Sequence, residues 1–439
     1  MPSVWGQTGF QGTVLPGGMG SPDLSTPGTI VLRDTETVIN WRPNDTTGTG
    51  EIDFLPSDQT VLFRNEVSGV SDFTVLNRIL PVDGSGISVS RVVALNGTVQ
   101  SEINGAAGGK VWFYAPGGIV AGASSIFNVG SLLLTSNDID MTGGLYGSGG
   151  EIRFRGPADV LTSVEVRSGA RIEALSSGSY VALVAPRVVQ AGTVQVNGSA
   201  AYVAAEAADI TINGGLFDIS ISAGTTDANG VVHTGTTERP GATVPDAQHV
   251  FMVAVPKNNA LTMLLSGNVG YDAANSAVQT DSGVVLSAGY DVSAGAVGVR
   301  NATATGEANI AIGSGTWQPD VNGQATGGIT VQPGVGAASF AAVNLTAERA
   351  ITVQAGAGGT VSASGNINLK AGEAVTLRAD QGGSISVGGN LNLTAGMAGT
   401  GGKIDVLTYG GSATAAGNGQ ISVTGSMFLD ASATRLGSA

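Results

Sequence analysis

The sequence has 439 residues, no cysteine and few charges: 12% of its residues are charged, about half the usual share. The absence of cysteine excludes a disulfide framework, cysteine catalysis and thiolate metal sites. Lysine occurs only four times, and the formal net charge is −14. Because phosphate binding needs clustered basic residues, nucleic acid is not an expected partner. No apolar run reaches the length of about 18 residues that a transmembrane helix needs.

Glycine, in contrast, is abundant, at 69 of 439 residues. That is about one residue in six, against an average near 7%. An apolar fraction of 42% argues against disorder, and the glycines lack a collagen period. Short segments alternate apolar and polar residues and end in Gly, Asn or Ser-Gly, a pattern typical of strands followed by turns. Examples are 87–92, 164–167, 193–197, 210–213 and 384–387.

A phrase of eight residues recurs near the end of the sequence. Residues 365–372 read GNINLKAG and residues 389–396 read GNLNLTAG, 24 positions later. A weaker copy, GSMFLDAS, follows at 425–432. Imperfect repeats of this length, with small residues at the turns, indicate the coils of a parallel β-helix, a solenoid in which each coil stacks on the last. A pair of β-sandwich domains is the competing hypothesis, although a sandwich rarely needs this much glycine.

Aromatic residues are concentrated at the amino-terminal end, where the first 130 residues hold 10 of the 22. The end of a solenoid exposes its apolar core and needs a cap. We therefore predict an aromatic cap followed by the first coils. The residues expected in this cap and the adjoining core are Trp41, Phe54, Trp112 and Phe113.

Residues 224–248 are polar and interrupt the repeat. This pattern predicts an excursion loop or hairpin leaving the solenoid, with His233 and His249 exposed in it or beside it. Two histidines at this spacing do not form a metal motif. The sequence therefore assigns no metal, no cofactor and no catalytic residue.

An enzymatic alternative depends on acidic residues on one strand. Several β-helix proteins cleave polysaccharides, and such sites need two or three clustered acids. Asp138 and Asp140 alternate and would face the same side, with Glu151 and Arg153 nearby. A solvated strand face explains these residues better, and the protein is not expected to be an enzyme.

Residues 41–140 resemble the secretion domain of filamentous-haemagglutinin-like exoproteins of Gram-negative bacteria. The resemblance covers about 100 residues and rests on the order and spacing of several motifs. These are Trp41, IDF at 52–54, VLNRI at 75–79, ALNGTV at 94–99, VWFYAPGGIVAG at 111–122 and FNVGSLL at 127–133. The family's Asn-Pro-Asn-Gly-Ile turn is changed here: it reads Ala115, Pro116, Gly117, Gly118, Ile119. Proline and glycine remain to form the turn, and both asparagines are lost.

The resemblance implies a passenger of two-partner secretion that is exported through the periplasm and folds outside the cell as a right-handed β-helix. Its expected partner is an outer-membrane β-barrel transporter, with surface glycans or proteins as further ligands. Residues 1–140 would form the cap and secretion-type domain, and 141–439 a β-helical shaft used in adhesion at the cell surface. The expected motif residues are Asn77, Arg78 and the turn from Ala115 to Ile119. A self-assembling filament, a toxin stalk and a polysaccharide-active enzyme are the alternatives, and we expect the chain to be part of a longer protein.

Overall fold

The structure is a computed structural model that describes residues 8–65, 72–213, 215–239, 248–270, 282–396, 401–409, 419–431 and 433–438. These residues form strands and turns without a helix, so none of their segments is a helix able to cross a membrane. They fall into two compact units. Unit 1 holds the described residues up to Ala223 together with 235–239 and 248, and unit 2 holds 224–234 and the described residues from His249 onward.

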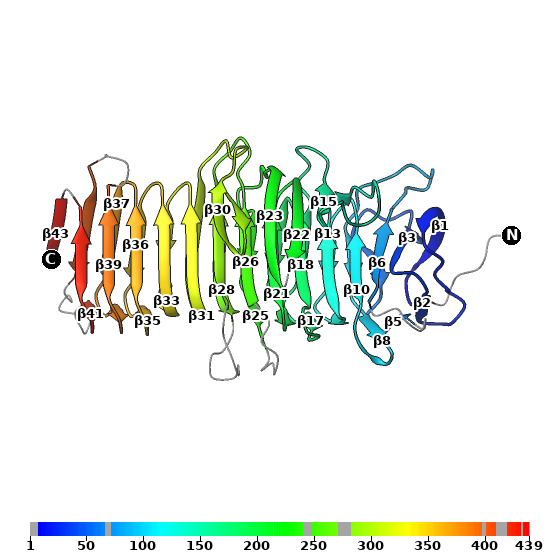
Figure 1. Ribbon diagram of the computed structural model, residues 1–439, viewed down its shortest axis with the longest axis horizontal. Coiled ribbons are helices and arrows are strands. Elements are labelled where there is room, and N and C mark those ends of the chain that lie inside the picture. Colours follow the sequence, from blue (N-terminus) through cyan, green and yellow to red (C-terminus); the bar gives the residue numbers. More distant parts are fainter. Residues whose placement is uncertain are drawn as a thin grey trace. The chain divides into compact units, whose positions relative to one another are not determined.

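Unit 1 is built of coils whose strands stack in three parallel columns, and Figure 1 shows strands of one column, such as β6, β10, β13 and β18, side by side. The first column is β3 (Glu36–Pro43), β6 (Thr74–Ile79), β10 (Lys110–Tyr114), β13 (Ser131–Thr135), β18 (Tyr180–Ala185) and β21 (Ser199–Ala204). The second is β4 (Ile52–Leu55), β7 (Val93–Leu95), β11 (Ile119–Ala121), β16 (Ser163–Val166) and β19 (Arg187–Gln190). The third is β2 (Thr29–Leu32), β5 (Thr60–Asn65), β8 (Thr98–Ile103), β12 (Ile126–Asn128), β17 (Arg171–Ala174), β20 (Thr193–Val196) and β25 (Thr236–Glu238).

Unit 2 repeats this arrangement with several strands long enough to join two or three columns. One column is β24 (Val231–His233), β27 (Leu261–Gly270), β31 (Ala308–Ala325), β32 (Ile329–Val331), β34 (Ile351–Ala355), β37 (Ala374–Ala379), β40 (Lys403–Thr408) and β43 (Ala433–Ser438). The next contains β26 (Gln248–Ala254), β28 (Ser282–Ala288), β31, β33 (Ala337–Ala347), β36 (Ile367–Ala371), β39 (Leu391–Ala395) and β42 (Met427–Asp430). The last contains parts of β27, β31 and β33 and then β35 (Thr360–Ala363), β38 (Ser384–Val387) and β41 (Gln420–Val423).

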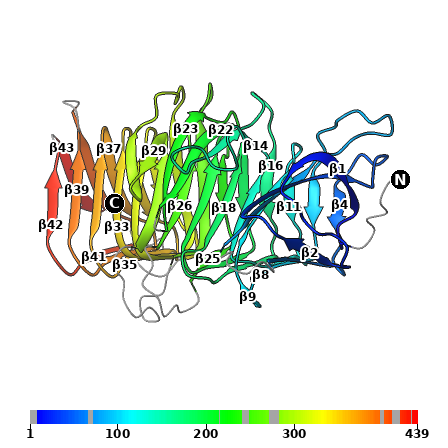
Figure 2. The ribbon, with the colours of Figure 1, turned by 45° about the vertical axis from the view of Figure 1, so that its right-hand side comes forward.

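Short antiparallel elements lie outside these columns. In unit 1, β14 (Asp138–Ile139), β15 (Ile152–Arg155), β22 (Ala207–Asn213) and β23 (Leu216–Ala223) pair antiparallel in this order, and we call these strands the outer sheet (Figure 2). β1 (Gly12–Met19) pairs antiparallel with β3, and β9 (Ala106–Ala107) with β8. In unit 2, β29 (Tyr290–Ser293) and β30 (Ala296–Arg300) form a hairpin. The outer sheet changes the surface of unit 1, because it covers strand faces that would otherwise meet solvent.

The interior of each coil is lined by apolar side chains that alternate with outward polar ones. At the amino-terminal end of unit 1, the ring of Phe10 lies 5.2 Å from that of Trp41 and 4.8 Å from that of Phe54, measured between centroids. Phe63 and Phe113 extend this cluster, with their centroids 6.4 Å apart. Trp41, Phe54 and Phe63 come from three different columns and are fully buried. Within the described residues, these rings fill the interior at this end of unit 1.

The predicted fold class, a parallel β-helix with an aromatic amino-terminal cap, is confirmed. The column strands pair in parallel from one coil to the next, whereas a β-sandwich would pair them antiparallel. The repeated phrase also stacks in register, because Asn368 lies opposite Asn392.

The segment 224–248 departs from its sequence interpretation. Its described part contains β24 and β25, which pair in parallel with β27 and β20, so this part follows the coils and does not leave them. His233 and His249 are buried and not exposed. β24 turns His233 inward, opposite the buried Leu265 of β27, and the ring of His249 stacks on that of Phe251. The polar composition of this segment led to the wrong prediction of a loop. Only the inward positions of a coil strand must be protected from water, so its outward positions can be polar. Residues 240–247 lie outside the described part of the chain.

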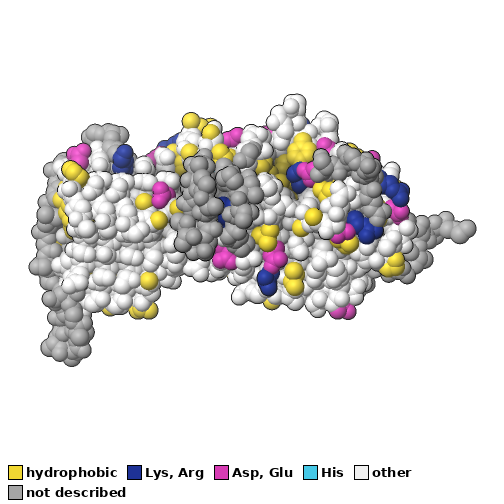
Figure 3. Space-filling model, turned by 60° about the horizontal axis from the view of Figure 1, so that its bottom comes forward, with side chains coloured by type: hydrophobic (Ala, Val, Ile, Leu, Met, Phe, Trp, Pro, Cys, Tyr) yellow, Lys and Arg dark blue, Asp and Glu magenta, His cyan; other side chains and the backbone are white. Residues whose placement is uncertain are grey.

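The surface carries few charges, and many of them lie beside a charge of opposite sign, as the face in Figure 3 shows. In unit 1, Arg91 pairs with Asp45 at 2.8 Å and Arg171 with Glu173 at 2.6 Å. Hydrogen bonds from Arg91, Thr47 and Gly48 hold the pKa of the Asp45 carboxyl well below its usual range. Most of the remaining surface is polar without charge, which matters for the ligands considered below.

The aromatic cluster generates a test of the cap. Phe113→Ala removes a fully buried ring from it and should lower the free energy of unfolding by about 3–5 kcal/mol. Urea unfolding followed by tryptophan fluorescence measures this change. Leu161→Ala, at a position 60% exposed in the same unit, is the matched control and should change stability by less than about 0.5 kcal/mol. Equal effects of the two substitutions would contradict a role of the ring in closing the core.

Candidate functional site

Two of the predicted motif residues, Asn77 and Arg78, lie on β6, which stacks in parallel between β3 and β10. Asn77 of β6 stands opposite Ile39 of β3 and Phe113 of β10. Its side chain is fully buried. The Nε1–H of Trp41 donates to Asn77 Oδ1 at 3.1 Å, and Asn77 Nδ2 donates to the carbonyl oxygen of Trp112 at 3.2 Å. One amide therefore connects three successive coils within the interior of the solenoid.

Arg78 follows Asn77 and points to the opposite face of the strand, toward the outer sheet. Its Nη2 donates to both carboxylate oxygens of Asp138, at 2.9 and 2.6 Å. Its guanidinium also lies 5.5 Å from the ring centroid of Tyr114, the residue opposite it on β10. Burial and the nearby Asp138 raise the pKa of Tyr114 to about 12. Arg78 thus ties the outer sheet to the coils, a contact across 60 residues of sequence that the motif pattern did not reveal.

Trp112 belongs to a different environment from the other three predicted cap and core residues. Trp41, Phe54 and Phe113 join the cap cluster, whereas Trp112 faces outward, beneath Tyr146, with ring centroids 5.3 Å apart. The Nε1–H of Trp112 donates to the hydroxyl of Tyr180 at 2.7 Å. Trp112 is nevertheless fully buried, because Tyr146, in the loop between β14 and β15 of the outer sheet, covers it.

A chain of hydroxyl groups extends from Trp112 across this covered surface. The Tyr180 hydroxyl accepts from Trp112, and the Tyr146 hydroxyl lies 3.0 Å from Thr74 Oγ1. Burial raises the pKa of Tyr146 to about 12 and that of Tyr180 well above its usual value. A hollow of about 550 Å³ adjoins the two tyrosines and is also lined by Lys110, Ile152 and Ile212. Sequence reasoning missed both tyrosines, because each stands in a glycine- and serine-rich context typical of turns.

The turn from Ala115 to Ile119 connects β10 with β11. The Gly118 N–H donates to the Ala115 carbonyl oxygen at 3.0 Å, which closes a four-residue turn with Pro116 at its second position. Gly118 has φ +105°, a backbone conformation that favours glycine. A β carbon on Gly117 would collide with the backbone of Arg91 in the preceding coil. The sequence pattern identified this turn, and its glycines are required by the backbone of the turn and of the adjacent coil.

The two acids considered for catalysis have structural partners. Asp138 is held by Arg78, and a carboxylate oxygen of Asp140 lies 3.9 Å from Arg153 Nε. Hydrogen bonds from Thr142 lower the pKa of Asp140, whereas a general acid in a glycosidase needs a raised one. In the described ranges of the chain, no group of three or more histidine, aspartate or glutamate side chains is placed to hold a metal ion.

Several solved structures are similar to this chain, and two of them are secretion domains. The chain is similar to the HMW1 secretion domain from Haemophilus influenzae, with 15% identity, a TM-score of 0.42, and coverage of 97% of this chain and 99% of that chain. It is also similar to the filamentous hemagglutinin secretion domain, with 15% identity, a TM-score of 0.25, and coverage of 95% and 97%. No protein-family model matches the sequence, and no curated protein matches it.

The buried amide generates a stability prediction. Asn77→Ala deletes both hydrogen bonds and leaves the Trp41 N–H without its acceptor. The free energy of unfolding should fall by about 2–4 kcal/mol, measured by urea unfolding. Asn128→Ala, at an exposed position of β12, serves as the control and should stay within about 0.5 kcal/mol. An unfolding free energy unchanged by Asn77→Ala would show that Asn77 does not hold the three coils together.

The tyrosines generate a pH prediction. Their pKa values are raised in the folded protein, that of Tyr146 to about 12 from the usual 10.0, so the neutral form stabilises the fold. This contribution is complete below pH 10 and is lost as the pH rises from 10 through 12. Urea midpoints measured across this interval should fall less steeply for Tyr146→Phe, which has no ionisable group there. Parallel pH profiles for wild type and Tyr146→Phe would contradict the assignment.

Proposed function

We propose that the chain is the amino-terminal part of an exoprotein exported by two-partner secretion. In this proposal residues 1–140 are the cap and secretion-type domain, and residues 141–439 are a β-helical shaft for adhesion at the surface of a Gram-negative cell. The main support for this proposal is that residues from separate motifs of the resemblance lie next to one another in the structure. Trp41, Asn77 and Trp112 come from three separate motifs and are joined by the hydrogen bonds of one buried amide.

The architecture supports export of an unfolded chain. Each coil pairs with its predecessor, so coils that form outside the cell can add to a stable end one at a time. Formation of the first coil is favoured by the aromatic cap, which supplies apolar contacts before any preceding coil exists. The absence of cysteine prevents wrong disulfides during passage through the oxidising periplasm. The partner in this proposal is an outer-membrane β-barrel transporter that recognises residues 1–140.

The enzymatic alternative receives less support from the geometry. Asp138 and Asp140 are engaged by arginines, and Asp138 holds the outer sheet in place through Arg78. We therefore propose a binding protein and not an enzyme.

The export proposal can be tested by distinguishing recognition of Arg78 by the transporter from the contribution of Arg78 to the fold. The chain is fused to a signal peptide, produced in a Gram-negative host together with a transporter of the two-partner type, and quantified in the medium. Arg78→Gln and Asp138→Asn remove the same ion pair from the folded protein, but only the first removes the arginine from the unfolded chain. Arg78→Gln should reduce the released amount several-fold, and Asp138→Asn should leave it near the wild-type amount.

Two results would contradict this proposal. Equal export of the two variants would show that Arg78 acts through folding alone. No release of the wild-type chain in the presence of a transporter would overturn the secretion function itself.

A further inference from the structure

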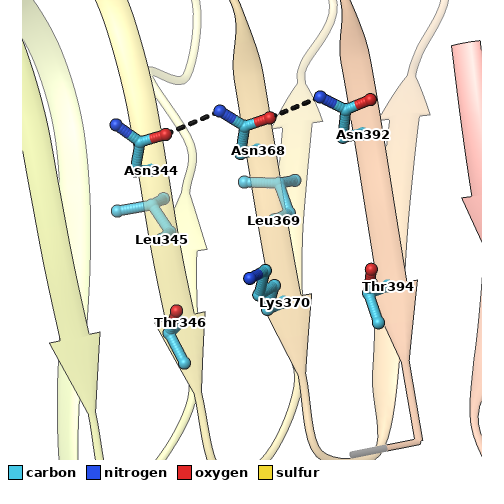
Figure 4. A pocket seen from close by; sticks show the side chains of 8 residues that line it. All are labelled: Asn344, Leu345, Thr346, Asn368, Leu369, Lys370, Asn392 and Thr394. Atoms are coloured by element: carbon cyan, nitrogen blue, oxygen red, sulfur yellow. Dashed lines mark hydrogen bonds between the residues drawn. The ribbon is translucent and has the colours of Figure 1, made fainter.

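Unit 2 presents a row of stacked asparagines on the outward face of one column. Asn322, Asn344, Asn368 and Asn392 lie opposite one another on β31, β33, β36 and β39. Each Nδ2 donates to the Oδ1 of the preceding asparagine, at 2.9, 2.6 and 2.5 Å along the row (Figure 4 shows the last two bonds). The adjoining residues Leu345 and Leu369 are buried in the interior. The amides therefore stand on a rigid surface and are held in one orientation.

These amides have hydrogen-bonding capacity left after the row is formed. A carboxamide has two N–H donors and two acceptor lone pairs, and a bond on each side of Asn344 or Asn368 uses one of each. Each of these coils thus offers one donor and one acceptor to a ligand. The pair repeats at the spacing of neighbouring strands, about 4.8 Å. A ligand with regularly spaced groups that both donate and accept, such as the hydroxyls of a sugar chain, matches this pattern.

A second outward row runs beside the asparagines and completes a trough. It contains Thr346, Lys370 and Thr394, each two residues after an asparagine and therefore on the same face of its strand. The space lined by the two rows is about 360 Å³, and it crosses β33, β36 and β39 (Figure 4). The trough thus runs across the strands, along the direction in which the coils stack.

Lys370 gives the trough a positive charge in an acidic protein. It is exposed, and in the described part of the chain it forms no ion pair. Neighbouring basic residues of unit 2 are engaged: Arg349 pairs with Glu307 and Glu373. The acidic residue in the row of Lys370 is Asp430, which lies two strands further along the column, on β42. A ligand that carries a carboxylate would satisfy the free ammonium group of Lys370.

The asparagine row ends at an exposed aromatic ring. Phe428 of β42 lies opposite Asn392, and 59% of it is exposed. A large exposed apolar side chain at the end of a polar row is suited to the apolar face of a sugar ring, since an aromatic ring offers a wide flat contact surface.

We propose that this trough binds a linear glycan with carboxylate groups, laid along the stacking direction with its hydroxyls on the asparagines and a carboxylate on Lys370. An extended peptide fits less well, because it binds by pairing with a strand edge and the trough crosses strands that are already paired. A nucleic acid needs several basic groups, and the trough has one. The inference rests on the proposed adhesive role of the shaft and names its ligand class.

The experiment uses the purified full chain, so its outcome is independent of export. Binding is measured by affinity electrophoresis in gels that contain polygalacturonate, a linear carboxylated glycan, or a neutral linear glucan. The wild type should be retarded more by polygalacturonate. Lys370→Gln should weaken this binding about threefold, the size expected for one exposed ion pair. The matched control is Lys403→Gln, which removes the same charge from a lysine paired with Asp405 on another column.

A second variant tests the amide row. Asn368→Ala breaks two bonds of the row and should weaken binding to both glycans, with the urea midpoint recorded to verify folding. The proposal is overturned if polygalacturonate does not retard the wild type, or if Lys370→Gln and Lys403→Gln bind alike. It is also overturned if Asn368→Ala changes stability and leaves binding intact. Any of these results would leave the export experiment unaffected, so the two proposals fail separately.

Discussion

Parallel stacking of one coil on the next is the constraint on which the other features of this protein depend. Each coil takes its backbone hydrogen bonds from its neighbours, so inward positions of successive coils must all be apolar and must fit the same narrow interior. In the part of unit 1 that the structure describes, Phe10, Trp41 and Phe54 fill the interior at the amino-terminal end. The same stacking places outward side chains in rows, so the side chains of one row repeat at a regular spacing on the surface.

Stacking also explains how much of the structure the sequence could predict. Alternation, glycine at the turns and a repeat of 24 residues all reflect the coil, so the fold class and the register of Asn368 on Asn392 follow from local pattern. The irregular third copy has the same basis, because Phe428 still stacks on Asn392 although 36 residues separate them. The number of residues between two copies varies in the segments that lie outside the columns. The strands within the columns keep the same register.

The candidate site was predictable only in part, because its outward half depends on segments remote in sequence. The sequence places Trp112 and Phe113 together, yet Phe113 joins the cap while Trp112 is covered by Tyr146. Local alternation assigns them to opposite faces, but it does not reveal that an outer sheet buries the outward one. The partnership of Arg78 with Asp138 was hidden for the same reason, since it depends on where that sheet is attached. His233 illustrates the converse, a polar residue turned inward by a strand that composition alone described as loop.

Asn77 shows why a polar residue belongs in such an interior. Apolar contacts are not directional, so aromatic and aliphatic side chains tolerate several ways of stacking one coil on another. A buried amide tolerates few, because any register that separates it from Trp41 Nε1 and the Trp112 carbonyl leaves polar groups unsatisfied. A shift by one residue would also move Asn77 to the outer face and Arg78 into the core. The amide therefore selects the register of β3, β6 and β10 against one another.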